Sequence, residues 1–330
     1  MRPENFLPVV CISLFVTSGR TIETTDNKNE NYATGDAENA TRSGAESVTL
    51  HLHIKGTENS FKVASVRNAG DLCAFLDFDC PTVKYIHGWN GNWTARDVVA
   101  VTREYILRGD HNVIIVDWGE VAGQFYPLAA AGTKEVGIEV AKGLDVLVKC
   151  GLRPESLHIV GHSLGSHVAG HVAKNAHSRL KRITALDPAG PLFNIILEPL
   201  TKNDAEEVVA IHTDMGVYGV KLRTGTVDFY PNGGHRFAPG CPKIYVPLSE
   251  EDFCSHWKSW GYYAESVRNE TAFYAVSCHS HSKFKVGLCK KNPYTVMGFA
   301  TPSDVTGKFY LDTNADFPYG MGKSGMRRTS

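Results

Sequence analysis

The stretch that decides the fold is SLHIVGHSLGSHVAG, residues 156–170. A mostly apolar run over 157–160 leads into Gly161-His162-Ser163-Leu164-Gly165, and a segment compatible with a helix follows. A G-x-S-x-G between a strand and a helix is a nucleophile elbow, in which glycines allow a sharp turn and leave the serine oxygen exposed at the helix N-terminus. The pattern is common by chance, but this context favours Ser163 as a nucleophile over a simple turn residue.

Short apolar runs alternate with helical patterns on both sides of the elbow. Strands are predicted over 48–54, 62–66, 82–86, 112–116, 157–160, 182–186 and 208–212, and helices over 98–107, 136–150 and 163–176. This alternation predicts an α/β fold, with a mainly parallel sheet and helices on both of its faces. Neither a repeat nor a linker interrupts the pattern, so we expect a single domain over residues 47–320.

The two ends of the chain differ from this domain. Residues 1–19 place one arginine before an apolar run and small residues, which is typical of a secretory signal peptide and too short to span a bilayer. Residues 20–46 are polar and are expected to be a disordered tail or propeptide, and residues 321–330 a solvated C-terminal tail.

The net charge of −1 over 330 residues gives no electrostatic footprint for nucleic acid. We expect a secreted, extracellular protein.

The cysteines agree with an oxidising environment. Of eight, Cys11 lies in the predicted signal peptide. Proximity suggests three disulfides and leaves Cys150 unpaired, although a sequence does not fix connectivity: Cys73–Cys80, Cys241–Cys254 and Cys278–Cys289. No cysteine spacing matches a zinc site, so no metal is expected. Three sequons mark possible glycosylation sites at Asn39, Asn92 and Asn269.

A serine hydroxyl attacks esters only when a histidine accepts its proton and a carboxylate orients that histidine. In α/β-hydrolases the acid follows a later strand, where ITALDPAGP supplies Asp187; the alternative is a turn-forming aspartate before proline. The histidines in the nucleophile's helix, in predicted strands and in polar loops fit poorly, which leaves His235 and His256. We favour His256, because a disulfide through Cys254 would fix its loop.

Several segments resemble the pancreatic-lipase family of animal lipases: GHSLGSHVAG, ITALDPAGPLF, VVAIHTD, DFYPNGG, APGC, FCSHWKSWGYYAES and GKFYLDTN. Together with HGW at 87–89 they follow the family's order over residues 82–314. The resemblance implies an α/β-hydrolase fold without a cofactor, with Ser163 as nucleophile, Asp187 as acid and His256 as base. It also implies an oxyanion hole formed by the backbone N–H groups of Trp89 and Leu164.

Two features depart from the pancreatic enzymes of this family. Those enzymes carry a C-terminal β-sandwich that binds colipase, whereas this chain ends soon after FYLDTN. Their calcium loop corresponds to FNIILEPLTKNDAEE, residues 193–207, in which only Asp204 matches an expected ligand. We therefore expect no β-sandwich domain, no colipase partner and no structural calcium.

Loop lengths bear on the substrate. In the family, the segment between the cysteines that match Cys241 and Cys254 is the lid, and here it is only PKIYVPLSEEDF, twelve residues with three acidic groups. The facing stretch from Leu192 to Asp204 also looks trimmed. A short cover hides less apolar surface and leaves room for a polar headgroup.

The short loops resemble those of phospholipases A1, of a short-lid insect type. We expect a monomeric serine ester hydrolase that cuts the sn-1 acyl ester of phospholipids at a membrane or lipid-droplet interface. The alternatives are a triacylglycerol lipase or general esterase, and a catalytically silent, yolk-like lipid-binding protein.

Overall fold

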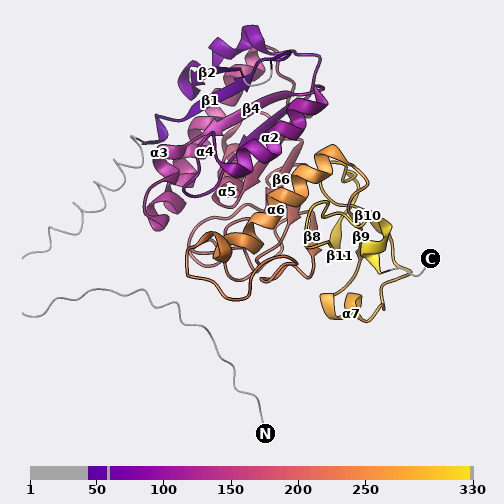
Figure 1. Ribbon diagram of the computed structural model, residues 1–330. Coiled ribbons are helices and arrows are strands. Elements are labelled where there is room, and N and C mark those ends of the chain that lie inside the picture. Colours follow the sequence, from indigo (N-terminus) through magenta and orange to yellow (C-terminus); the bar gives the residue numbers. More distant parts are fainter. Residues whose placement is uncertain (1–43, 58–59, 328–330) are drawn as a thin grey trace, which may run out of the picture.

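The computed structural model describes residues 44–57 and 60–327. The predicted signal peptide, most of the predicted polar tail and Asn39 lie outside the described residues. Within them, eleven strands form one sheet (Figure 1). Their order across the sheet is β10 (Tyr294–Val296), β9 (Tyr274–Ser277), β11 (Gly307–Leu311), β8 (Val227–Pro231), β7 (Glu207–Ile211), β6 (Arg182–Leu186), β5 (Leu157–His162), β3 (Thr82–Ile86), β4 (Asn112–Asp117), β1 (Thr49–His53) and β2 (Phe61–Ser65).

Parallel pairing runs without interruption from β4 through β3, β5, β6, β7 and β8 to β11. The strands outside this block pair antiparallel: β1 and β2 at one edge, β9 and β10 at the other. Parallel strands need crossover connections, and helices supply most of them. The carboxyl ends of the parallel strands therefore meet along one edge of the sheet, where a site is expected.

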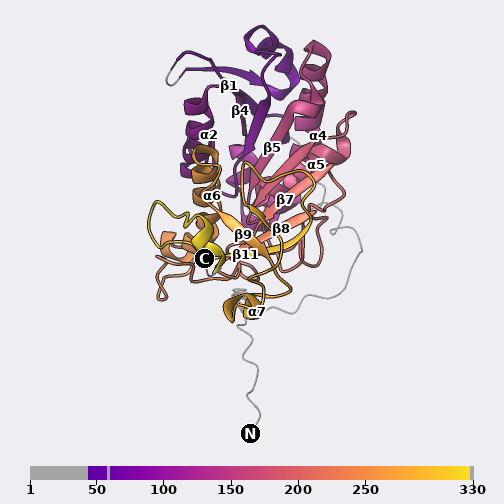
Figure 2. The same ribbon diagram turned by 90° about the vertical axis from the view of Figure 1, so that its right-hand side faces the viewer.

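Helices cover both faces of the sheet, as Figure 2 shows in a view along its edge. One face carries α4 (Tyr126–Cys150) and α5 (Leu164–Asn175), and the other carries α2 (Arg96–Arg108) and α6 (Glu250–Arg268). Alternate strand residues face opposite sides: Ile86 and Ile159 pack toward α4 and α5, whereas Tyr85 and Val160 pack toward α2 and α6. The predicted α/β-hydrolase architecture, a mainly parallel sheet between two helical layers, is confirmed.

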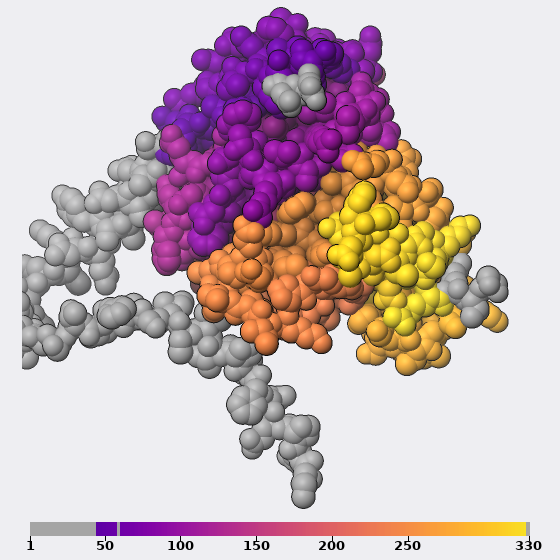
Figure 3. Space-filling model, viewed as in Figure 1, coloured from indigo at the N-terminus to yellow at the C-terminus, as the bar shows by residue number. Residues whose placement is uncertain are grey.

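The sequence crosses the sheet in one general direction. In the space-filling view (Figure 3), the indigo N-terminal part lies at one end and the orange and yellow C-terminal part at the other. The remaining elements are short: η1 (Val66–Phe75), α3 (Gly119–Ala122), η2 (Pro154–Ser156), α7 (His281–Lys285) and η3 (Lys323–Met326). Among the residues described, no helix has the length and apolar character needed to cross a bilayer.

Most predicted elements are present, but their limits differ. The helix expected over 136–150 begins at Tyr126, because Pro127 suits a first helical turn and alanines follow it. The four strands from β8 to β11 were not predicted. Buried residues also extend beyond the expected domain of 47–320: Ala45 and Met326 are each only 2% exposed.

One of the predicted disulfides is wrong. Cys73 pairs with Cys150, not with Cys80, and the two cysteines lie 77 residues apart in the sequence. The cause is the fold: η1, which carries Cys73, packs against α4, which ends at Cys150. Cys80 is unpaired and contacts the side chains of Lys55 and Asp77. The structure contains the other two expected disulfides, Cys241–Cys254 and Cys278–Cys289.

Lys84, in the middle of β3, is fully buried between Ile114 and Ile159 of the neighbouring strands. Its Nζ has no hydrogen-bond partner among the described residues. Burial lowers the pKa of Lys84 to about 7, and Asp145 offsets this only in part. Because the unfolded chain keeps a pKa of 10.5, it binds more protons than the folded chain between these two values. This lysine therefore makes the protein more stable as pH rises from 7 toward 10.

We predict that Lys84→Met stabilises the fold at pH 6 by about 3–5 kcal/mol and removes this pH dependence. The expected gain shrinks as pH rises and approaches zero only above 10.5, the pKa in the unfolded chain, where the wild-type lysine is neutral in both states. Denaturant unfolding of the variant and of wild type at several pH values measures this difference in the free energy of unfolding. Lys142→Met is the control, because the Lys142 side chain is 65% exposed and its removal should leave the pH dependence unchanged. Equal stability of Lys84→Met and wild type at pH 6 would contradict the prediction.

Candidate active site

Ser163 lies at the junction of β5 and α5, at the carboxyl edge of the sheet. Its backbone has φ 54° and ψ −121°, a conformation that costs energy for any residue with a Cβ. The flanking glycines are required by close packing: a Cβ on Gly165 would lie 2.2 Å from the carbonyl oxygen of Ile86, and one on Gly161 would lie 2.4 Å from that of Gly165. The sequence G-x-S-x-G thus forms a tight, strained strand-to-helix turn.

Asp187 directly follows β6 and is fully buried. Its Oδ2 lies 2.6 Å from Nδ1 of His256, and its Oδ1 accepts hydrogen bonds from the backbone N–H groups of Thr213 (2.8 Å) and Asp214 (3.1 Å). Three donors therefore hold one carboxylate. When that carboxylate is ionised, Nδ1 of His256 carries the proton and Nε2 is left free to accept one.

His256 belongs to α6 and not to a loop, which corrects the expectation from sequence. Ser249 caps this helix by accepting from the Asp252 N–H at 3.3 Å, and three acidic residues occupy its first turn. The acidic residues assigned to the lid therefore begin the helix, and only residues 242–249 are irregular between the two cysteines. His235, the other candidate base, is exposed, and the structure brings His256 rather than His235 to Asp187.

The HGW loop that follows β3 lies beside Ser163. A Cβ on Gly88 would come within 2.9 Å of the Ser163 Cβ. Trp89 is anchored by its ring N–H, which donates to the Gln124 carbonyl at 2.8 Å. Leu164 is the first residue of α5, so its backbone N–H has no acceptor within the helix. The two predicted oxyanion donors thus belong to segments that flank the serine.

Sequence reasoning missed a second histidine–carboxylate pair at this site. His162 Nδ1 lies 3.2 Å from Asp97 Oδ2, and the His162 ring centroid lies 4.9 Å from that of His256. Burial lowers the pKa of His162, and only part of this is offset by Asp97. His162 is part of the elbow motif, but no sequence signal linked it to Asp97, 65 residues earlier.

The segments around the site expose apolar side chains. Between the cysteines Cys241 and Cys254, Ile244 is 91% exposed and Val246 71% exposed, and on the facing stretch Ile195 is 89% exposed. These side chains face solvent and do not form the underside of a closed cover.

No metal-binding cluster accompanies the site in the part of the chain that the structure describes: no three His, Cys, Asp or Glu side chains there could hold an ion together. Asp204, the one match to the calcium loop, accepts from the Thr201 N–H at 2.7 Å and lies 3.5 Å from the Lys174 ammonium.

The backbone N–H of Ser163 donates to the carbonyl of Leu186 at 3.0 Å, which places the strained elbow next to Asp187 and its bond to His256. Such an elbow and a buried histidine–aspartate pair at the carboxyl ends of parallel strands define the α/β-hydrolase class. Comparison with known sequences narrows this class further. The family model described as Lipase matches residues 9–319, and the chain belongs to that family, as the motifs predicted.

Similar proteins include Lipase member H-A of Xenopus laevis, which is 36% identical over 219 residues, covering 65% of this chain and 47% of that protein. Lipoprotein lipase of Sus scrofa is 35% identical over 268 residues (72% and 55%), and Pancreatic lipase-related protein 3 of Homo sapiens is 36% identical over 265 residues (72% and 55%). The chain spans about half the length of these curated relatives.

Solved structures that overlap the chain include an α/β serine hydrolase without lid from Xanthomonas campestris. It is 14% identical with a TM-score of 0.31, and the overlap covers 50% of this chain and 64% of that one. An α/β-hydrolase from a deep-sea metagenome library is 11% identical with a TM-score of 0.32, covering 53% and 73%. The fold assignment rests on the sheet order and the family match.

Proposed function

We propose that the protein is a secreted serine carboxylic-ester hydrolase that acts on lipids, most specifically a phospholipase A1 that cuts the sn-1 acyl ester of glycerophospholipids. The observation that carries the proposal is the 2.6 Å hydrogen bond between His256 and the buried Asp187, next to the strained elbow of Ser163. A histidine oriented in this way can act as a general base toward a neighbouring hydroxyl.

In the proposed mechanism, the Ser163 hydroxyl attacks the acyl carbonyl while Nε2 of His256 takes its proton. The backbone N–H groups of Trp89 and Leu164 stabilise the resulting oxyanion, and Asp187 stabilises the imidazolium. His256 then protonates the leaving glycerol oxygen, and a lysophospholipid departs. Water, activated by the same histidine, hydrolyses the acyl-enzyme and releases a fatty acid. Only the neutral imidazole of His256 can accept the serine proton.

The preference for phospholipid is supported by the loops around the site. The segment 242–249 has no helix, and its apolar residues Ile244, Val246 and Leu248 are exposed. Opening such a segment uncovers little additional apolar surface, so an oil interface adds little to the free energy of opening. A short cover also leaves space and water for a charged headgroup beside the scissile ester.

A triacylglycerol lipase is the second candidate, because one similar protein is named Pancreatic triacylglycerol lipase (Myocastor coypus, 33% identical over 263 residues). The third is a silent lipid-binding protein of this fold. We regard it as less favoured because the serine, histidine and aspartate are all retained.

Product analysis on phosphatidylcholine with two different acyl chains, run beside triolein at matched interfacial area, tests the proposal. We expect release of the sn-1 acid and at least about a 10-fold preference for phosphatidylcholine, equivalent to about 1.4 kcal/mol in transition-state stabilisation. We also expect no jump in rate at an oil interface. A preference for triolein together with such a jump would replace the proposal with a gated lipase.

Secretion is part of the proposal. Three disulfides in the described part of the chain suit an oxidising compartment, and residues 1–19 have the pattern of a signal peptide. Asn92 and Asn269 are exposed, and we propose both as glycan attachment sites. The proposed partner is a lipid surface, and a monomer needs neither colipase nor nucleic acid to act on it.

A further inference from the structure

We propose that Arg236 is a positioning residue that couples the loop holding the Asp187 carboxylate to the helix carrying His256. The proposal deepens the proposed function, on which its kinetic tests rest. Arg236 touches neither Ser163 nor the Asp187–His256 hydrogen bond in any contact of the structure, so its effect would be indirect.

Arg236 bridges two carboxylates from different segments. Its Nε and Nη2 donate to the two oxygens of Asp214 at 3.0 and 2.7 Å, and its Nη1 donates to Oδ1 of Asp252 at 2.5 Å. The side chains of Asp214 and Asp252 are buried, with exposures of 0% and 5%, and that of Arg236 is partly buried at 13%. A bidentate guanidinium that is largely shielded from water is held in one geometry, unlike a mobile surface pair.

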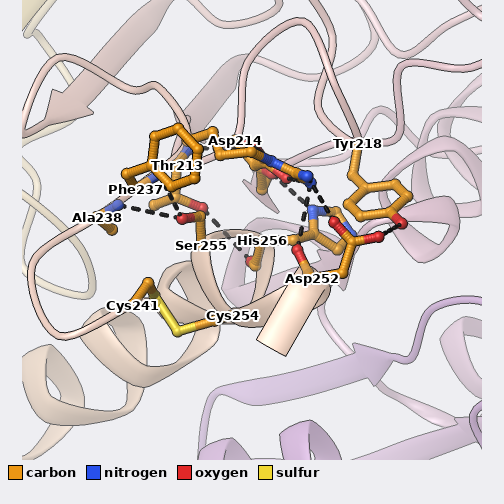
Figure 4. A network of polar contacts seen from close by, with 12 residues as sticks. Thr213, Asp214, Tyr218, Phe237, Ala238, Cys241, Asp252, Cys254, Ser255 and His256 are labelled. Carbon is orange, nitrogen blue, oxygen red and sulfur yellow. Dashed lines mark hydrogen bonds and ion pairs between the residues drawn. A yellow bond between two sulfur atoms is a disulfide. The ribbon is translucent and has the colours of Figure 1, made fainter. Parts of the chain in front are cut away.

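Each end of the bridge leads to one member of the histidine–aspartate pair. The backbone N–H of Asp214 donates to Oδ1 of Asp187, and the side-chain carboxylate of Asp214 accepts from Arg236. Asp214 therefore binds the acid through its backbone and the arginine through its side chain. Asp252 lies four residues before His256 on α6, one turn away on the same side of the helix. Figure 4 shows Asp252, Ser255 and His256 along this helix, with Asp214 and Thr213 opposite them. The arginine therefore links the acid's loop and the base's helix through two residues.

Neighbouring contacts reinforce the same junction. Oγ of Ser255 accepts from the backbone N–H groups of Phe237 and Ala238 at 3.0 and 3.1 Å, next to the Cys241–Cys254 disulfide (Figure 4). The Tyr218 hydroxyl donates to Oδ2 of Asp252 at 2.6 Å, and the Arg236 guanidinium stacks 5.0 Å from the Tyr218 ring. These bonds hold residues 236–238 on the helix, so loss of the guanidinium would loosen one attachment without dissolving the loop.

The bridge also balances charge around His256. Burial raises the pKa of Asp214, and the nearby Asp187 raises it further, whereas Arg236 opposes both. The charged and titratable groups around His256 include Asp187, Asp214, Asp252, Tyr218, His162, Asp97 and Arg236, and α6 itself adds Glu250, Glu251 and Lys258. Without the guanidinium, this environment becomes more negative and favours protonated His256. The acid limb of the kcat/KM profile would then move to higher pH.

The test compares Arg236→Gln, Arg236→Lys and Asp252→Asn with wild type on a soluble ester, p-nitrophenyl butyrate. Small displacements of catalytic groups cost up to about 10²-fold, so we expect kcat of Arg236→Gln to fall about 10- to 100-fold, with KM within about two-fold. Arg236→Lys should recover part of kcat, because one ammonium replaces the charge but not the fork. Asp252→Asn removes the negative charge from one arm of the bridge while leaving an acceptor oxygen, so it should reproduce part of the loss.

Arg268→Gln is the matched control. Arg268 lies at the far end of the same helix and makes a bidentate pair with Glu104 at 2.8 and 2.6 Å. We expect its kcat and its pH profile to equal those of wild type. Thermal unfolding of every variant identifies any that fails to fold.

Proton NMR of the His256 Nδ1–H, a strongly deshielded signal assigned by its loss in His256→Gln, tests the positioning without any turnover. We expect this signal to weaken or shift in Arg236→Gln and to persist in Arg236→Lys and Arg268→Gln. If wild-type protein hydrolyses no ester, the proposed function fails, and the NMR comparison still decides the role of Arg236. An Arg236→Gln variant that folds and keeps the wild-type kcat, pH profile and NMR signal would overturn the positioning role.

Discussion

Replacing Ser163 with alanine is expected to lower kcat for ester hydrolysis by about 10⁶-fold, the size of loss seen when a triad nucleophile is removed. The reason is chemical: alanine has no oxygen to form the acyl-enzyme, and what remains is binding and oxyanion stabilisation. The fold should survive, because alanine keeps the Cβ that the elbow already accommodates at φ 54°. Initial rates on p-nitrophenyl butyrate and phosphatidylcholine, together with thermal unfolding, measure both effects.

A covalent organophosphate probe complements the kinetics. Wild type should be labelled on Ser163, and Ser163→Ala should not be labelled at all. Ser324→Ala, at an exposed serine, serves as control and should match wild type in labelling and rate. Labelling of another residue, or near wild-type turnover by Ser163→Ala, would remove Ser163 from the mechanism, and an unlabelled, well-folded wild type would favour the silent lipid-binding protein.

The parts of the site that could be predicted from sequence are those encoded by local patterns. The elbow glycines appear in the sequence because the backbone of Ile86 leaves no room for a Cβ at Gly165. Asp187 stands at a strand end within a recognisable motif, and His256 was found by excluding the other histidines and from family resemblance. The parallel sheet between two helical layers followed in the same way from alternating periodicities.

Long-range pairings could not be predicted in this way. Cys73 and Cys150 are joined only because η1 packs on α4, and the nearer Cys80 misled the argument from proximity. The links of Asp214 to Asp187 and of Arg236 to Asp252 likewise depend on how separate loops meet. The strands from β8 to β11 were missed because their short runs lie among turns and glycines. Such features arise from tertiary packing, which local propensity does not report.

Replacing Asp187 with asparagine is expected to lower kcat by about 10⁴-fold at neutral pH, through the wrong tautomer of His256. The surrounding bonds determine this outcome. The N–H groups of Thr213 and Asp214 both point at Oδ1, so an asparagine should keep its carbonyl oxygen there and turn its NH₂ group toward His256. Nδ1 of His256 must then accept a hydrogen bond, which puts the ring proton on Nε2, where it cannot take the proton of Ser163.

The matched control for Asp187→Asn is the same substitution in another buried histidine–aspartate pair of the sheet. Asp228 Oδ1 lies 2.9 Å from Nε2 of His212, and both side chains are fully buried, but His212 is not a candidate base. Asp228→Asn should lower the unfolding temperature and leave kcat per folded molecule close to that of wild type. For Asp187→Asn, labelling of Ser163 by the organophosphate should slow in parallel with kcat, since both need the same proton transfer. The prediction fails if a folded Asp187→Asn variant keeps kcat within about ten-fold of wild type, which is only about 1.4 kcal/mol in activation free energy. The 2.6 Å bond between Asp187 and His256 would then be structural rather than catalytic.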